Sequence, residues 1–182
     1  MFTISDIETT GLNPSVNEIV QFAYLRLDDN LTPLQSGCMY FWHPKMIWGA
    51  EEIHHIPEAL AREHADEFED NLRRMYTILS GADVVGHNCN SFDIPFCRQF
   101  LARHGLRDMN VNNGYDTMSI YHPVFKKRMK LENLAQELGI TEEIITMCCN
   151  MWFGENSHAH DARYDVTMTE LIFAQALRTG VL

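Results

Sequence analysis

The sequence contains no apolar run that approaches the roughly 20 residues needed to span a bilayer, which predicts a soluble protein with no membrane partner. It also contains no Cys-x-x-Cys pair, and its five cysteines are an odd number, so a disulfide framework is not indicated. No charged and apolar leader precedes the first motif of the chain. These absences together favour the reducing cytoplasm.

Basic residues are scarce too, because 14 Lys and Arg stand against 25 Asp and Glu, for a formal net charge of -11. Proteins that bind nucleic acid normally do so through a broad basic surface that releases counterions from the phosphates. Acidic residues that ligate cations would offset part of this negative charge. We therefore expect any binding to nucleic acid to be weak and to cover only a few nucleotides.

The length and the hydrophobic pattern predict the architecture. A chain of 182 residues with 46% apolar content suits one compact domain over residues 1–182, and no linker or internal repeat interrupts it. Alternating apolar positions predict strands at 1–7, 19–27, 37–42, 82–86 and 111–115. Helical periodicity and glycine stops predict helices at 68–79, 91–101, 131–138, 141–153 and about 159–178. Strands that are followed by alternating strands and helices indicate an α/β domain with a mixed sheet.

Acidic side chains at strand and helix ends are the most informative residues. Asp6 and Glu8 lie two residues apart on a predicted strand, so both point to one face and can meet one cation. Asp93 starts a helix directly after a buried strand, where α/β sheets bind ligands but where an acid can also be a cap. Asp165 follows His160 by five residues in a pair that, taken alone, is typical of a solvated surface.

These residues occur within a series of motifs that spans almost the whole chain. The series, in chain order, is Asp-x-Glu-Thr-Thr-Gly-Leu from Asp6, His-Asn-x-x-x-Phe-Asp from His87, Tyr-Asp-Thr from Tyr115, Leu-Glu-Asn-Leu from Leu131 and His-Asp-Ala-x-x-Asp-Val from His160. It resembles the DEDDh (DnaQ-like) family of 3′-to-5′ exonucleases. The resemblance implies an α/β, ribonuclease H-like fold with a central mixed five-stranded sheet flanked by helices.

The resemblance also implies roles for the acidic residues and the histidine. Four carboxylates are expected to bind two Mg²⁺ or Mn²⁺ ions, namely Asp6, Glu8, Asp93 and Asp165. His160 is expected to be the general base, and a histidine titrates near neutrality as that role requires. Two cations about 4 Å apart can stabilise the attacking and the leaving oxygen of an in-line displacement. The products implied are nucleoside 5′-monophosphates released from a 3′ end.

Further residues are candidates for substrate binding. The turn after Glu8 would present backbone N–H groups to the terminal nucleotide, Leu12 and Phe92 would stack against bases, and His54 matches a segment that flanks the substrate in the family. Ordinary core positions for the two apolar residues, and an exposed helix position for His54, are the alternatives. The full set of candidates is Thr9, Thr10, Leu12, His54, Asn88 and Phe92.

The spacing of the second motif bears on the substrate. Three residues separate Asn88 from Phe92, which is similar to exonuclease I and the three-prime repair exonucleases, whereas ribonuclease T and epsilon-type patterns have two. This favours the 3′ end of single-stranded DNA over RNA. An exoribonuclease on short RNA remains an alternative, because recognition of the 2′-hydroxyl is not visible in one sequence. A second alternative is a non-catalytic module that binds nucleic-acid ends or a polymerase. The sequence does not decide whether the partner is a polymerase or a second copy of the chain in a homodimer.

Overall fold

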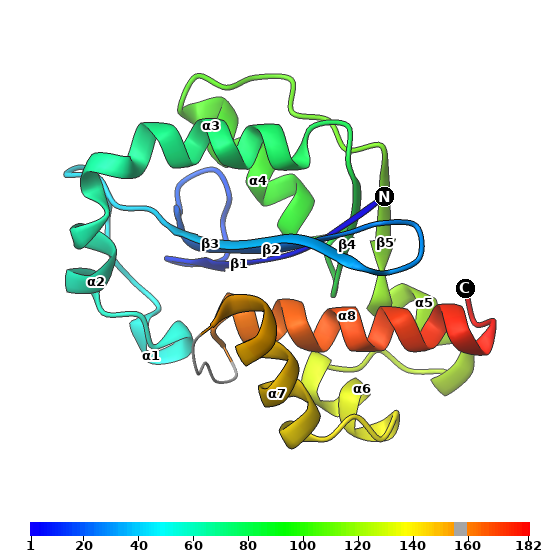
Figure 1. Ribbon diagram of the computed structural model, residues 1–182. Helices are drawn as coiled ribbons and strands as arrows, with labels where there is room; N and C mark the ends of the chain where they lie inside the picture. The colour runs from blue at the N-terminus through cyan, green and yellow to red at the C-terminus, as the bar shows by residue number, and fades with distance from the viewer. Residues whose placement is uncertain (155–159) are drawn as a thin grey trace.

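A five-stranded sheet runs through the middle of the molecule (Figure 1) in the computed structural model, which describes residues 1–154 and 160–182. The strands, in the spatial order β3-β2-β1-β4-β5, are β3 (Pro33–Tyr40), β2 (Ile19–Leu27), β1 (Phe2–Thr9), β4 (Asp83–Gly86) and β5 (Asn113–Asp116). The first three strands pair antiparallel, while β4 and β5 run parallel to β1. The prediction of a mixed five-stranded sheet is therefore confirmed.

Helices cover both faces of this sheet (Figure 1). One face carries α3 (Phe68–Leu79) and α4 (Asp93–Arg103). The other carries α8 (Ala162–Thr179), with α5 (Thr117–Phe125), α6 (Leu131–Glu137) and α7 (Glu142–Phe153) packed around it. Two short helices, α1 (Glu51–His54) and α2 (Glu58–Glu63), and a 3₁₀ turn, η1 (Ala65–Glu67), connect β3 to α3.

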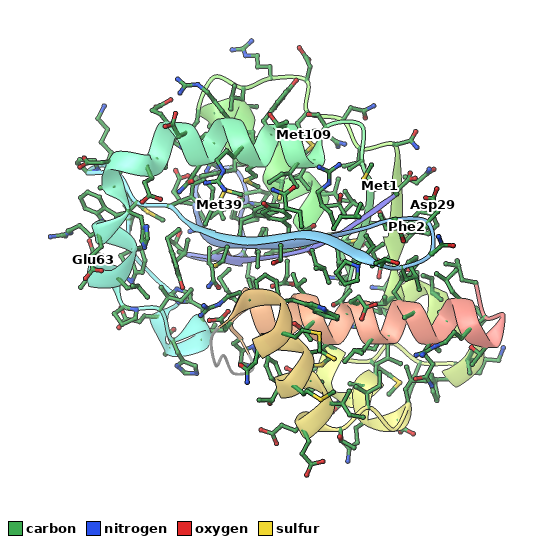
Figure 2. The ribbon with its side chains drawn as sticks, in the orientation of Figure 1. Met1, Phe2, Asp29, Met39, Glu63 and Met109 are labelled. Carbon is green, nitrogen blue, oxygen red and sulfur yellow. The ribbon has the colours of Figure 1, made fainter. Side chains whose placement is uncertain are left out.

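The alternation of side chains along β1 divides the core between the two faces. Ile7 packs into the cluster beneath α3 and α4, which also contains Met39 between α3 and the sheet (Figure 2). Ile4 packs on the opposite face against Phe173 of α8. Each such fully buried side chain contributes about 1.5–3 kcal/mol, so this division is strongly specified. Because positions 4, 6 and 8 share a face, the carboxylates that follow Ile4 must point toward α8.

The observed elements differ from the predicted ones at a few ends. β1 extends through Glu8 to Thr9, because both residues still pair with β2, whereas we expected it to end at Ile7. β3 starts at Pro33 and ends at Tyr40, so the prediction of 37–42 was wrong at both ends. The last helix begins at Ala162, and the predicted start near residue 159 lies outside the described residues.

Helix α5 is an element that the sequence pattern did not predict. Its isoleucine, valine and internal Pro123 are poor helix formers, so the intrinsic preference of the segment is weak. The helix forms because Asp116 caps its start, accepting hydrogen bonds from the backbone N–H groups of Met118 and Ser119. Tyr121 then packs against Ile172 of α8, its hydroxyl donating to the Ile172 carbonyl at 3.4 Å. Tertiary contacts thus outweigh the weak local preference.

The two chain ends lie on the same side of the molecule (Figure 1). The amino group of Met1 forms an ion pair with the Asp29 carboxylate in the β2–β3 turn (Figure 2). Within the described ranges, none of the helices has the length and apolar character required to cross a membrane.

Candidate active site

Three carboxylates from distant parts of the chain meet on the α8 face of the sheet. Asp6 and Glu8 extend from β1, and Asp165 lies in the first turn of α8. One oxygen from each of the three lies within 4.8 Å of the others. We call these residues the carboxylate cluster. The structure therefore brings together three of the four acidic residues that were predicted to bind cations.

Helix α8 is held in this position by its first residues. Asp161 caps the helix, accepting from the Arg163 backbone N–H at 2.9 Å. The backbone N–H of Ala162 donates to the side-chain oxygen of Gln21 at 2.9 Å, and Gln21 is the β2 residue that pairs with Glu8. Asp165 then follows one turn into the helix, above β1. The sequence analysis missed both Gln21 and Asp161, although a glutamine between the apolar residues Val20 and Phe22 was a usable signal.

The fourth acid, Asp93, approaches from the other side of β1. It is the first residue of α4 and is 5% exposed, and its carboxyl group accepts a backbone hydrogen bond from Ile7 of β1. Phe92 occupies the N-cap position of α4, and its side chain forms no capping hydrogen bond. Asp93 is therefore not the helix cap, which was the alternative interpretation of its position. Asp93 lies outside the 4.8 Å set but is the largest charge contribution to the raised pKa of Asp6.

All four acidic groups have raised pKa values, and the main cause is burial. Desolvation, followed by the charge of Asp165, raises the pKa of Glu8 to about 9. Desolvation, followed by the charge of Glu132 in α6, raises the pKa of Asp165 to about 8. Burial raises the pKa of Asp93 to about 7 and that of Asp6 well above its usual range. Such a group of mutually repelling acids is typical of a site that binds cations.

The donor atoms of the cluster fit hard divalent cations. Asp165 Oδ1 is buried and has no hydrogen-bond partner among the described residues, which is costly unless another group satisfies it. The convergent ligands are all carboxylate oxygens, the type that Mg²⁺ and Mn²⁺ prefer. Bound cations would satisfy the orphaned oxygen and remove the repulsion that raises the pKa values.

His160 lies at the edge of the cluster with its side chain 48% exposed. Its Nε2 atom is 3.9 Å from Glu132 Oε1, and its backbone forms a hydrogen bond to the Asp165 carboxyl group. The residue has a φ of 65°, so the chain turns sharply just before α8. The structure thus places the backbone of His160 next to the cluster and its imidazole beside Glu132.

The first group of candidate substrate residues lies at the end of β1 and in the loop that follows it. Thr9 and Thr10 are buried, and their hydroxyl groups bond within the loop: Thr9 Oγ1 donates to the Gly11 carbonyl, and Thr10 Oγ1 accepts from the Glu18 backbone N–H. Leu12 is 81% exposed at the tip of the loop. The threonines therefore shape the loop, whereas Leu12 is an apolar side chain free to contact a base.

The second group of candidates lies on three other segments. His54 is only 1% exposed, so the alternative of an exposed helix histidine is wrong; its Nε2 atom lies 3.1 Å from the Gly49 carbonyl. Phe92 is half-buried and packs on Phe96, with ring centroids 5.4 Å apart. Asn88 adopts a φ of 61° and donates its backbone N–H to Asp116 Oδ1 at 2.9 Å. Their roles in substrate binding stay predictions.

In the absence of divalent cations, the protein is expected to lose stability as the pH rises from about 4 to about 9. Carboxyl groups in the unfolded chain ionise near pH 4, whereas in the folded protein Glu8 keeps its proton up to about 9 and Asp165 up to about 8. The folded state then binds more protons, and its stability falls with rising pH. Thermal unfolding in chelator at pH 5 and pH 9 measures this, and added Mg²⁺ should raise Tm more at pH 9.

A matched pair of variants tests whether the carboxylate cluster, rather than other carboxyl groups, causes this pH dependence of Tm. Glu8→Gln should flatten the pH dependence of Tm, because the glutamine does not ionise. Glu63→Gln, at the exposed end of α2 (Figure 2), should leave it unchanged. If Tm fell equally with pH in both variants, the pH dependence would not come from Glu8.

Comparisons with known proteins find similar sequences. The RNase T family model, described as an exonuclease, matches residues 3–173. The chain is 27% identical over 146 residues to the PolC-type DNA polymerase III of Lacticaseibacillus paracasei, covering 78% of this chain and 10% of the polymerase. It is 26% identical over 181 residues to exodeoxyribonuclease I of Buchnera aphidicola, covering 92% of this chain and 44% of that protein.

Solved structures show the same fold. E. coli exonuclease I in complex with a dT13 oligonucleotide superimposes with a TM-score of 0.74 at 21% identity, over 98% of this chain and 42% of that one. The prediction of a ribonuclease H-like α/β fold is confirmed by this similarity and by the sheet order. The chain thus spans about a tenth of the polymerase relatives and less than half of the exonuclease I relatives.

Proposed function

Because the chain belongs to the RNase T exonuclease family, we propose that it hydrolyses nucleic acids from their 3′ ends and needs divalent cations to do so. One observation carries this proposal: Asp6, Glu8 and Asp165 converge within 4.8 Å, and the buried Asp165 Oδ1 has no hydrogen-bond partner in residues 1–154 and 160–182. The three acids repel one another, so their convergence does not stabilise the fold. In this proposal residues 1–182 act as one exonuclease domain.

The residues have separate roles in the proposed reaction. Four carboxylates hold two Mg²⁺ or Mn²⁺ ions: Asp6, Glu8, Asp93 and Asp165. When bound, the cations stabilise negative charge on the phosphoryl group and make water a stronger acid. His160 accepts the proton of the attacking water, and for this its half-exposed side chain turns from Glu132 toward the cluster. The products are nucleoside 5′-monophosphates.

The main substrate in this proposal is the 3′ end of single-stranded DNA. Two of the similar proteins support it, since one is named exodeoxyribonuclease I and the other was solved with a dT13 oligonucleotide. The exposed Leu12 offers a surface that stacks on any base without reading its sequence. With a net charge of -11, the chain binds only a short stretch of strand and releases it often.

The test uses an oligonucleotide with a 5′ label, a free 3′-hydroxyl end, and Mg²⁺ or Mn²⁺. We expect a ladder of products shortened from the 3′ end, free mononucleotides, and complete loss of activity in chelator. RNA of the same sequence should be degraded more slowly. Faster cleavage of the RNA than of the DNA would overturn the proposal that DNA is the main substrate. Binding of the oligonucleotide without shortening in Mn²⁺ would overturn the proposal of an enzyme and favour a module that binds nucleic-acid ends.

A further inference from the structure

A second cluster of potential ligands lies on the opposite face of the sheet from the carboxylate cluster. Glu18 ends the loop between β1 and β2, His43 follows β3, and His104 follows α4. One ligand atom from each of these residues lies within 4.8 Å of the others. The β1–β2 loop rises toward the side of the sheet that α3 and α4 cover (Figure 1). The three residues thus come from three segments that are far apart in the sequence.

The spacing of the donor atoms is close to that of a metal site. His104 Nε2 lies 3.2 Å from Glu18 Oε2, and His43 Nε2 lies 3.8 Å from Glu18 Oε1. In a tetrahedral zinc site, bonds of about 2.0–2.1 Å separate neighbouring donors by roughly 3.3 Å. A cation between the three groups would need only small side-chain movements.

An orphaned nitrogen points into this cluster. His43 Nε2 is buried and has no hydrogen-bond partner among the described residues, since its distance to the glutamate exceeds a hydrogen bond. Burial also lowers the pKa of His43. A buried polar atom without a partner is rare, and a bound cation would satisfy this one.

Aromatic rings form an apolar wall around the two imidazoles. The Phe68 ring lies 5.1 Å from the His43 ring and 5.0 Å from the His104 ring, measured between centroids. The Phe100 ring lies 4.9 Å from the His104 ring. This wall holds both imidazoles in their orientation, so that little ordering is needed when a cation binds. A pre-ordered set of ligands of this kind favours tight binding.

Existing contacts at these residues would have to change when a cation binds, because His104 Nε2 forms a hydrogen bond with Glu18 Oε2 at 3.2 Å. Arg103 donates to Glu18 Oε2 at 2.9 Å, which leaves Oε1, the oxygen nearer His43, without a hydrogen bond from the described residues. The Lys45 backbone N–H donates to His43 Nδ1 at 3.3 Å. If Nε2 bound the cation, Nδ1 would carry the proton of the ring, and this contact would be lost. The Lys45 contact is long and exposed, so water can replace it.

We propose that Glu18, His43 and His104 form a zinc site that is distinct from the carboxylate cluster, with water as the fourth ligand. Two imidazoles and one carboxylate suit Zn²⁺, whereas Mg²⁺ prefers oxygen ligands alone. The bound ion would join the β1–β2 loop to the segment after β3 and to the end of α4. That loop carries Thr10 and Leu12, so zinc would steady candidate substrate contacts without taking part in hydrolysis.

The test removes the carboxylate cluster so that zinc bound there does not interfere. The full chain carrying Asp6→Asn and Asp165→Asn is dialysed against Zn²⁺ with excess Mg²⁺, and bound metal is counted by mass spectrometry. We expect one zinc per chain. Adding His43→Gln or His104→Gln should lower zinc affinity by at least about 10-fold, whereas His122→Gln, on an exposed face of α5, should not change it.

A measurement on the unmodified chain removes any dependence on how the variants fold. Zinc added in the presence of Mg²⁺ should shift the imidazole NMR signals of His43 and His104 and leave those of His122 in place. Absence of zinc from the variant without the carboxylate cluster would overturn the proposal, as would zinc binding that survives both histidine substitutions. Neither result bears on the 3′-end hydrolysis proposed for the carboxylate cluster.

Discussion

Replacing Asp6 with asparagine is expected to lower the rate of 3′-end shortening by at least about 1,000-fold, equivalent to about 4 kcal/mol of transition-state stabilisation. Asp6 shares the cluster with Glu8 and Asp165, and its substitution removes a charged ligand from the centre of the site. The amide keeps the shape of the side chain but binds hard cations weakly. Single-turnover rates at saturating Mn²⁺ measure the effect.

The stability of the same variant provides the internal control. Burial and the charges of Asp93, Asp165 and Glu8 raise the pKa of Asp6, so a neutral residue at this position should not destabilise the protein in chelator. Asp66→Asn, at an exposed residue of η1, should change neither activity nor Tm. If Asp6→Asn retained more than a tenth of the activity while remaining folded, Asp6 would not be a ligand.

Replacing His160 with glutamine should lower the maximal rate by about 10²- to 10⁴-fold, the usual contribution of a general base. The rate of the variant should recover in part at high pH, where hydroxide replaces the missing base. Affinity for Mn²⁺ should be unchanged, because the proposed ligands are carboxylates. Rates and Mn²⁺ affinity, measured from pH 6 to pH 9, separate the role of a base from that of a ligand.

The position of His160 makes this variant a clean test. Its side chain is 48% exposed, so its replacement should change stability by less than about 0.5 kcal/mol. His122→Gln, another exposed histidine, serves as the matched control and should retain full activity. A loss of less than about threefold in the His160 variant would mean that another group accepts the proton, and Glu132 would then be examined first.

Much of the fold and part of the site follow from local patterns in the sequence. Strand β2 and helix α3 have the bounds that their periodicity predicts, because period 2 and period 3.6 are properties of neighbouring residues. The same rule placed Asp6 and Glu8 on one face of β1. Helix α5 was not predicted, because its residues have a weak intrinsic preference for helix. Its formation depends on the Asp116 cap and on packing against α8.

The sequence by itself determined which chemical groups this protein has, their order, and the face of the strand on which the first two acids lie. Only the tertiary structure decided which groups meet: Gln21 holds the start of α8, at a separation of 141 residues, and so places Asp165 over β1. The same is true of Glu18 and His104, which are 86 residues apart and lie 3.2 Å from each other. The reason is physical, since periodicity is set by adjacent residues, whereas the distances between segments and the burial of their polar atoms are set by packing across the sheet.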